Sequence, residues 1–358
     1  MSRFTREGRV FFVEEPIFDA ASARMEASEV LPNLWVCTPH LPESLPPPVV
    51  ERLQRELLEQ LVREREVVKP IVWFYTPMAL PFAEGIDASL VVYDVMDELS
   101  AFRGAPPELL DRETQLYAHA DLVFTGGQSL YESKRSRHAA VYAFPSSVDA
   151  AHFAQARNRG EDPPDQRSVP DMRLGFFGVI DERMDLELIA SLARARPNYQ
   201  IVMIGPVVKI PESSLPRLPN IHYLGGKSYG ELPAYIAGWQ VAIMPFALNE
   251  ATRFISPTKT LEYLAAGKPI VSTAVKDVVS PYGDNGVVHI ADEGSFPAVV
   301  DAAFATDLNQ HIQVCDRVLE RTSWDKTWSE MHELITGSVE RKSRASVPQK
   351  GSSSCSTI

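Results

Sequence analysis

Short apolar segments alternate with amphipathic stretches along most of the chain. Residues 49–66 carry apolar side chains on one helical face and Glu and Arg on the other. Residues 71–75 are short and apolar throughout, as strands buried in parallel sheets are. For the first half we expect strands at residues 9–15, 34–38, 71–75, 90–94, 121–125 and 140–144, and helices at 49–66, near 106–119 and from 129.

The same alternation resumes in the second half. We expect strands at residues 173–178, 200–204, 221–224, 241–244, 270–274 and 287–290. Helices are expected near residues 185–195, 230–237, 257–266 and 295–306, with a final helix at about 308–337 that crosses back onto the first domain. Strand–helix alternation favours a doubly wound parallel sheet, so the sequence predicts an α/β protein with two such sheets.

A polar, proline-rich segment without periodicity separates the two series at residues 155–170. It predicts an interdomain linker between a first domain, 1–154, and a second domain, 171–338. Two domains also suit a chain of 358 residues, which exceeds what one core normally fills. Residues 339–358 are rich in Ser, Lys and Arg, so we expect a disordered tail there.

The net charge of −12 argues against nucleic acid as the main partner. The basic run 134–138 is best interpreted as a solvated helix end; a weak contact with an anionic membrane surface is the bolder interpretation. The three cysteines, Cys37, Cys315 and Cys355, have no disulfide or metal-ligand spacing. With no signal peptide and no apolar run of ~20 residues, we expect a cytoplasmic protein, at most peripheral at the inner face of the membrane.

Residues 256–274 are the most informative stretch of the chain. Ser256 can cap a helix, Pro257 suits its first turn, and Gly267 with Pro269 ends it before a short apolar strand. Such a helix start offers free N–H groups to a phosphate, and Glu262 follows far enough along to reach a ribose. A capped helix with a purely structural role is the alternative that these residues leave open.

As a whole, this string resembles the donor site of retaining, GT-B type glycosyltransferases related to glycosyltransferase family 4. The residues that carry the resemblance are Ser256, Pro257, Thr258, Lys259 and Glu262. It implies two Rossmann-like domains facing a cleft, a nucleoside diphosphate sugar as donor, retention of configuration, and no metal or other cofactor. Relatives also carry an earlier glutamate that touches the sugar.

Counting back eight residues from Glu262 reaches Phe254, so that glutamate is missing here. The resemblance leaves the sugar contact to neighbours: Asn249, Glu250, Thr252 or Arg253. Family members that resemble residues 3–16 carry another strand and a loop ahead of them. We therefore expect this chain to lack the family's first strand.

Further donor residues follow strand ends in the second half. Gly175 and Gly178 follow the first strand, and glycine lets a backbone approach a ligand closely. The resemblance then gives Arg183 to the diphosphate, although an ion pair with Asp181 or Asp185 explains it equally well. Gly205 closes the next strand, and Leu224 begins the segment, through Tyr229, that contacts the nucleobase in relatives.

The first half supplies an acceptor side. Asp97 aligns with the Asp of a His-Asp pair near the sugar in relatives, with Met96 at the His position. Asp94 and Glu98 lie close by, and solvated loop carboxylates are the alternative for all three. Gly127, in a glycine turn before a helix, is a further candidate. From the resemblance, Asp97, Arg183 and Lys259 are the expected catalytic residues.

These observations predict a glycosyltransferase that moves a hexose from a UDP- or GDP-sugar to a hydroxyl acceptor. The acceptor would be a glycan, a lipid-linked or a small molecule, in polysaccharide, cell-envelope glycan or natural-product synthesis. An epimerase or phosphorylase shares the fold, and fold does not fix chemistry. A catalytically degenerate nucleotide-binding protein is the alternative from another class. The sequence makes no prediction of oligomeric state.

Overall fold

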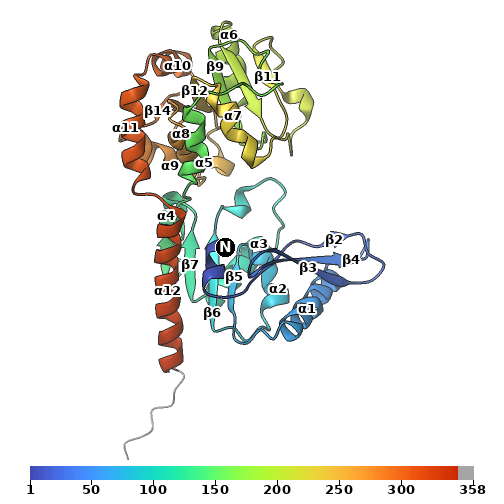
Figure 1. Ribbon diagram of the computed structural model, residues 1–358. Helices are drawn as coiled ribbons and strands as arrows, with labels where there is room; N and C mark the ends of the chain where they lie inside the picture. Colours follow the sequence, from blue (N-terminus) through green and yellow to red (C-terminus); the bar gives the residue numbers. More distant parts are fainter. Residues whose placement is uncertain (346–358) are drawn as a thin grey trace, which may run out of the picture.

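The first domain is built on two separate four-stranded sheets. A computed structural model describes residues 1–345 of the chain (Figure 1). One sheet places β1 (Val10–Val13) and β2 (Ile17–Phe18) beside β4 (Leu34–Leu41), with β3 (Arg24–Leu31) on the other side of β4. The other sheet has the order β5 (Ile71–Phe74), β6 (Leu90–Val95), β7 (Leu122–Thr125), β8 (Val141–Ala143), and all its pairs are parallel.

Strand β3 is not parallel and was not predicted. It pairs antiparallel with β4 and turns through Asn33, whose φ is +65°. Its sequence, RMEASEVL, has one β-branched and no aromatic residue, whereas strands are typically rich in both. For this reason the sequence did not predict a strand here. The expectation of a wholly parallel first domain is therefore wrong at this end, where β2, β3 and β4 project sideways (Figure 1).

Helices cover the first domain as the hydrophobic pattern predicts. Helix α1 (Pro47–Glu64) buries Leu57, Leu58 and Leu61, and the last two belong to a cluster that also contains Phe74 and Tyr93. The other helices are α2 (Leu80–Ala83), α3 (Leu109–His119) and α4 (Gln128–Lys134).

The second domain contains one six-stranded parallel sheet of order β11-β10-β9-β12-β13-β14. Its strands are β9 (Arg173–Phe177), β10 (Gln200–Ile204), β11 (Ile221–Tyr223), β12 (Val241–Met244), β13 (Ile270–Ser272) and β14 (His289–Ile290). Its helices are α5 (Ala150–Ala154), α6 (Leu186–Ala195), α7 (Leu232–Ala237), α8 (Lys259–Ala265), α9 (Lys276–Val278), α10 (Phe296–Phe304) and α11 (Leu308–Leu319). All six strands lie at predicted positions, and the sheet is doubly wound.

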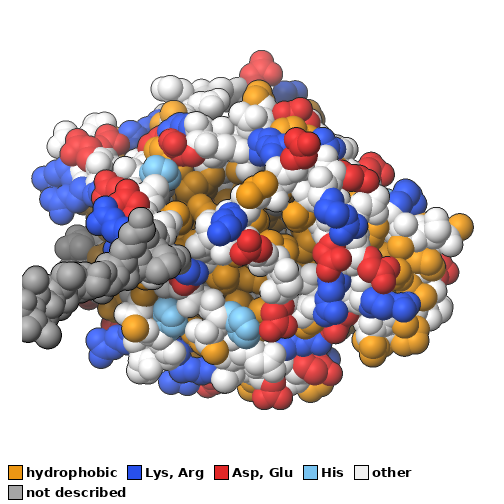
Figure 2. All heavy atoms as spheres, turned by 90° about the horizontal axis from the view of Figure 1, so that it is seen from below, with side chains coloured by type: hydrophobic (Ala, Val, Ile, Leu, Met, Phe, Trp, Pro, Cys, Tyr) orange, Lys and Arg blue, Asp and Glu red, His pale blue; other side chains and the backbone are white. Residues whose placement is uncertain are grey.

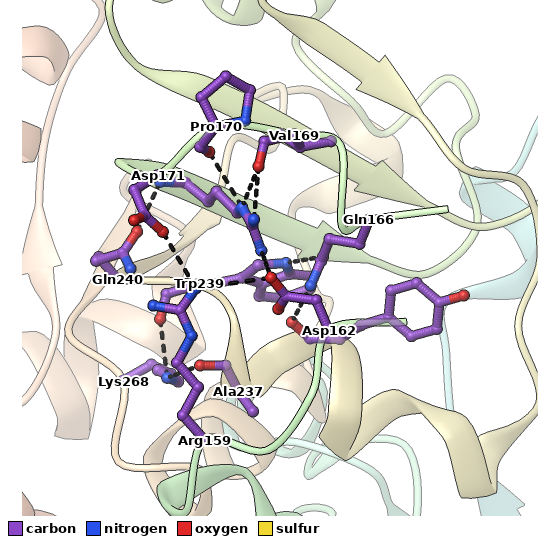
Figure 3. Close-up of polar contacts among 12 residues, drawn as sticks. Arg159, Asp162, Gln166, Val169, Pro170, Asp171, Ala237, Trp239, Gln240 and Lys268 are labelled. Carbon is purple, nitrogen blue, oxygen red and sulfur yellow. Dashed lines mark hydrogen bonds and ion pairs between the residues drawn. The ribbon is translucent and has the colours of Figure 1, made fainter. Parts of the chain in front are cut away.

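The segment predicted as a linker is packed against the second domain rather than free in solvent. Gln166 is fully buried; its Oε1 accepts a hydrogen bond of 2.9 Å from Trp239 Nε1, and its Nε2 donates to the Tyr235 carbonyl (Figure 3). Arg173 pairs with Asp162 at 2.9 Å. Val148 and Phe153 also belong to the second core, so the chain enters the second domain earlier than the predicted boundary at 154.

Helix α12 (Trp324–Ala345) returns to the first domain, as predicted. Ile335 packs with Leu90 and Phe124 of the β5–β8 sheet, and the helix runs beside β6 and β7 in Figure 1. A break at residues 320–323 separates it from α11. Residues 339–345 are helical, so the predicted disordered tail is wrong for them, because Val339 packs beside Ile335; its remainder, 346–358, lies outside the described residues.

Candidate functional site

The ends of β9 and β10 meet at two glycines, Gly178 and Gly205. Their φ angles are +134° and +142°, a region that favours glycine. A β-carbon on Gly205 would overlap the carbonyl oxygen of Gly178, and the Gly178 N–H donates a 2.8 Å hydrogen bond to the Ile204 carbonyl. The carboxyl ends of these parallel strands thus form a tight edge that only glycine permits. Gly175, by contrast, makes room for Trp239 and faces no site.

Lys259, at the start of α8, passes directly over Gly178. A β-carbon on Gly178 would lie 2.7 Å from Lys259 Nζ. The ammonium lies 5.7 Å from the ring centre of Phe176 and 5.8 Å from that of Phe177. Among the described residues it has no hydrogen-bond partner, and burial lowers its pKa, an effect that the nearby Arg183 reinforces and Glu262 opposes. A partly desolvated cation of this kind is ready for an anionic ligand.

Glu262 lies one turn along α8 from Lys259. Burial raises the pKa of this carboxyl, while Lys259 and a hydrogen bond from the Thr258 side chain oppose the rise. Its Oε2 is buried without a partner among the described residues. The neighbouring Tyr263 hydroxyl accepts a 3.1 Å hydrogen bond from the Phe177 N–H, which holds α8 against the end of β9.

Arg183 is held by the buried Asp181. Its Nε and Nη2 donate to the Asp181 carboxylate at 3.0 and 2.7 Å, so the ion-pair alternative is confirmed. The Nη1 group has no hydrogen-bond partner among the described residues. The guanidinium also lies 5.8 Å from the ring centre of Phe102 in the first domain. Arg183 therefore lies at the boundary between the domains, and its Nη1 group can donate hydrogen bonds to a ligand.

The predicted capping role of Ser256 is wrong. Helix α8 begins at Lys259, after a turn in which the Thr260 N–H donates to the Pro257 carbonyl at 3.1 Å. The Ser256 side chain instead lies beside Asp277 and lowers the pKa of that carboxyl, against the larger raising effect of burial. The Asp277 Oδ1 accepts a 3.0 Å hydrogen bond from the Ser129 N–H at the start of α4. Ser256 thus belongs to an interdomain contact, which sequence analysis missed because its partners are distant along the chain.

Gly127 is part of the same contact. A β-carbon there would overlap Asp277 and lie 2.8 Å from Cβ of Ser256. The glycine is needed because the second domain packs directly on it. Its predicted acceptor role therefore gives way to packing.

The other predicted donor residues make different contacts. Arg253 is exposed and pairs with Glu250 at 3.5 Å. Phe254 packs against the hydrophobic cluster of the first domain. At the end of β11 the Leu224 N–H donates a 3.0 Å hydrogen bond to the Met203 carbonyl. Tyr229 stacks on His152 at 4.2 Å, is 51% exposed, and lies near enough to Glu262 for that carboxylate to raise its pKa.

The acceptor-side carboxylates separate into two places. Burial raises the pKa of Asp97, and the nearby Arg183 partly opposes this rise. Asp94 is only 3% exposed and accepts a 3.1 Å hydrogen bond from Trp73 Nε1. Burial raises the pKa of Asp94 to about 6. Only Asp97 therefore faces the donor side.

The basic run 134–138 is not a continuous exposed patch. Lys134 is buried and pairs with Glu98 at 2.8 Å and with Glu113 at 3.0 Å. The hydrophobic periodicity of the sequence did not predict these ion pairs, because both glutamates are distant from Lys134 along the chain. Within residues 1–345, no helix is long and apolar enough to cross a membrane. No group of three or more His, Cys, Asp or Glu side chains in that range could hold a metal ion.

Known proteins show the same architecture. The model resembles Anabaena HepE in complex with UDP and glucose, at a TM-score of 0.62 and 14% identity over 78% of this chain and 81% of that one. It resembles sucrose-phosphate synthase of Thermosynechococcus elongatus at 0.68 and 13%, over 92% and 88%. A structure from E. coli described as trehalose-6-phosphate bound with UDP-2-fluoro glucose gives 0.66 and 12%, over 92% of each chain. The chain therefore has the two-domain GT-B fold.

The second domain matches a sequence family. Residues 173–306 match the model of the family described as Glycosyl transferases group 1. A 168-residue region is 30% identical to the "Putative teichuronic acid biosynthesis glycosyltransferase TuaH" of Bacillus subtilis (strain 168). That region spans 45% of this chain and 38% of the relative.

Proposed function

We propose that the protein transfers a hexose from a UDP-sugar to a hydroxyl acceptor in polysaccharide synthesis. The observation that carries the proposal is the meeting of Gly178, Gly205, Lys259 and Glu262 at one edge of the second sheet. Lys259 is a cation without a hydrogen-bond partner among the described residues, and the glycines let a diphosphate approach the backbone. UDP is favoured over GDP because HepE was crystallised with UDP and with UDP-glucose.

Lys259 and Arg183 would stabilise the leaving diphosphate. In the transfer, the bond between the sugar carbon and the diphosphate oxygen breaks, the acceptor oxygen bonds that carbon, and the acceptor proton passes to a phosphate oxygen of the leaving UDP. Negative charge grows on the diphosphate, beside Lys259 and the free Nη1 of Arg183. We propose that this charge stabilisation requires no metal ion. Retention of configuration and membership of family 4 are further parts of the proposal, on the strength of the 256–274 string.

A nucleotide-binding protein without turnover is the second candidate. The observation that favours it is Phe254, which stands near the place of the relatives' sugar-contacting glutamate and packs on the first domain. An aromatic side chain there supplies no carboxylate to the sugar.

Binding and turnover distinguish the two candidates. Calorimetric titration with UDP and GDP should show binding of UDP that Lys259→Met weakens at least tenfold, while Lys69→Met, at an exposed position, leaves it unchanged. UDP release from UDP-glucose, UDP-galactose or UDP-N-acetylglucosamine should depend on an added acceptor. UDP binding without UDP release or sugar transfer supports the non-catalytic candidate. Conversion of the donor sugar to its epimer indicates an epimerase. If Lys259→Met keeps both its UDP affinity and its turnover, the proposed site is wrong.

A further inference from the structure

A cavity lies at the carboxyl ends of strands in the first domain. It has a volume of about 200 Å³ and is lined by residues that follow β5, β6 and β8, by the first residues of the chain and by α12. Tyr75 follows β5, Met96 follows β6, and Phe144 and Ser146 follow β8. In open α/β sheets ligands bind at this edge of the sheet. No residue of the donor site lines the cavity.

Asp94 supplies the cavity with an unsatisfied acceptor. Its Oδ2 accepts the hydrogen bond from Trp73 Nε1, but Oδ1 has no hydrogen-bond partner in the described part of the chain. The side chain is 3% exposed, so this oxygen depends on what enters the cavity. A carboxylate oxygen that lines a cavity and has no protein partner can accept a hydrogen bond from a hydroxyl of a ligand there.

Six aromatic side chains line the cavity: Phe4, Trp73, Tyr75, Phe144, Trp324 and Trp328. Rings of this kind bury the C–H faces of a sugar, while a carboxylate accepts its hydroxyl protons. The volume is below the ~300–1,000 Å³ of pockets for drug-sized ligands, so the cavity suits a single ring.

We propose that this cavity binds one neutral or amino sugar residue of the acceptor, with a ring hydroxyl donating to Asp94 Oδ1. This inference rests on the proposed glycosyl transfer and names its acceptor class. Met96, which is 43% exposed, lines the cavity and directly precedes Asp97, the carboxylate near Arg183. A sugar in the cavity can therefore extend past Met96 toward the donor site.

The charges around Asp94 exclude a uronic acid. Arg3 lines the cavity with its guanidinium bonded to Asp325 at 3.0 and 3.2 Å. A second carboxylate would thus meet the Asp94 carboxylate, while the basic side chain that lines the cavity, Arg3, is already paired.

Tryptophan fluorescence tests binding without requiring turnover, since three of the five tryptophans line the cavity. Methyl glucoside, methyl N-acetylglucosaminide, methyl glucosaminide and methyl glucuronide are titrated into the full chain. Saturable changes are expected with the first three and none with the glucuronide. Asp94→Asn should weaken binding about tenfold or more and leave UDP affinity unchanged, while Asp111→Asn, at an exposed site on α3, changes neither.

A second variant tests the cavity independently, in case Asp94→Asn fails to fold. Met96→Phe adds bulk at an exposed position on the rim and should reduce sugar binding with UDP affinity intact. Preference for the glucuronide, no saturable sugar binding in a protein that binds UDP, or sugar binding that neither variant weakens would each overturn the cavity proposal. Sugar binding that follows these expectations in a protein that transfers no sugar would leave the cavity assignment standing and reject the proposed transfer.

Discussion

The Asp277 carboxylate accepts a hydrogen bond of 3.0 Å from the Ser129 N–H, joining the second domain to the start of α4 in the first. The contact is buried: Asp277 is 5% exposed and Ser129 2%. Beside it, Lys276 pairs with Glu132 at 2.5 Å on the surface. Two adjacent residues therefore make cross-domain contacts that differ mainly in burial.

We expect Asp277→Ala to destabilise the folded chain by about 1–3 kcal/mol, because it leaves the buried Ser129 N–H without a partner. Thermal and denaturant unfolding measure the effect, and small-angle scattering reports whether the domains separate. Lys276→Ala should change stability much less, since exposed ion pairs contribute little. Equal effects of the two substitutions would show that burial of the Asp277 contact does not govern domain packing.

Gly178→Ala should disable the donor site. The added β-carbon would lie 2.7 Å from Lys259 Nζ, and a φ of +134° is strained for alanine. We expect at least a tenfold loss of UDP affinity by calorimetry, with a lower melting temperature. Gly160→Ala is the matched control, because a β-carbon there meets nothing within 4 Å and its φ is not positive. Unchanged UDP affinity in Gly178→Ala would separate this loop from the ligand.

The motif that identifies the donor side could be predicted from sequence because its members are neighbours. Lys259 and Glu262 are one turn apart on one short helix, so any fold that forms the helix places both. Ser256 was misassigned for the opposite reason, since its partner Asp277 and the Ser129 N–H come from distant parts of the chain. No local pattern encodes such a contact.

The same distinction explains the other departures. Strand β3 exists because β4 offers it an edge, not because its own residues favour a strand. Lys134 is buried because it pairs with Glu98 and Glu113, both of which are distant from it in sequence. The Asp94 cavity needs α12 to return from the end of the chain, and its lining could not be predicted from the strand that carries Asp94.

We expect Ser256→Ala to affect stability and Thr258→Ala to affect UDP binding. Loss of the Ser256 hydroxyl removes a polar group beside the buried Asp277 and should lower stability by about 1 kcal/mol with UDP affinity unchanged. Loss of the Thr258 hydroxyl frees Glu262, whose carboxyl it stabilises, and should weaken UDP binding. Calorimetry and thermal melting on both variants measure the two effects; a large loss of UDP affinity in Ser256→Ala would restore its predicted phosphate role.

The pH dependence of UDP binding should report Lys259. Burial lowers the pKa of this ammonium below its usual 10.5, so in the free protein it loses its proton at lower pH than an exposed lysine does. A bound diphosphate favours the charged form, and affinity should therefore be full below the lowered pKa and fall as pH rises through it.

Lys259→Arg should extend strong binding to higher pH, since a guanidinium stays protonated there, provided that its fork reaches the same phosphate oxygens. Lys259→Met should bind weakly with little pH dependence over the same alkaline range. Calorimetric titrations of the three proteins from neutral to alkaline pH make the comparison. An alkaline loss of affinity that persists in Lys259→Met would assign the titration to another group and remove Lys259 from the diphosphate site.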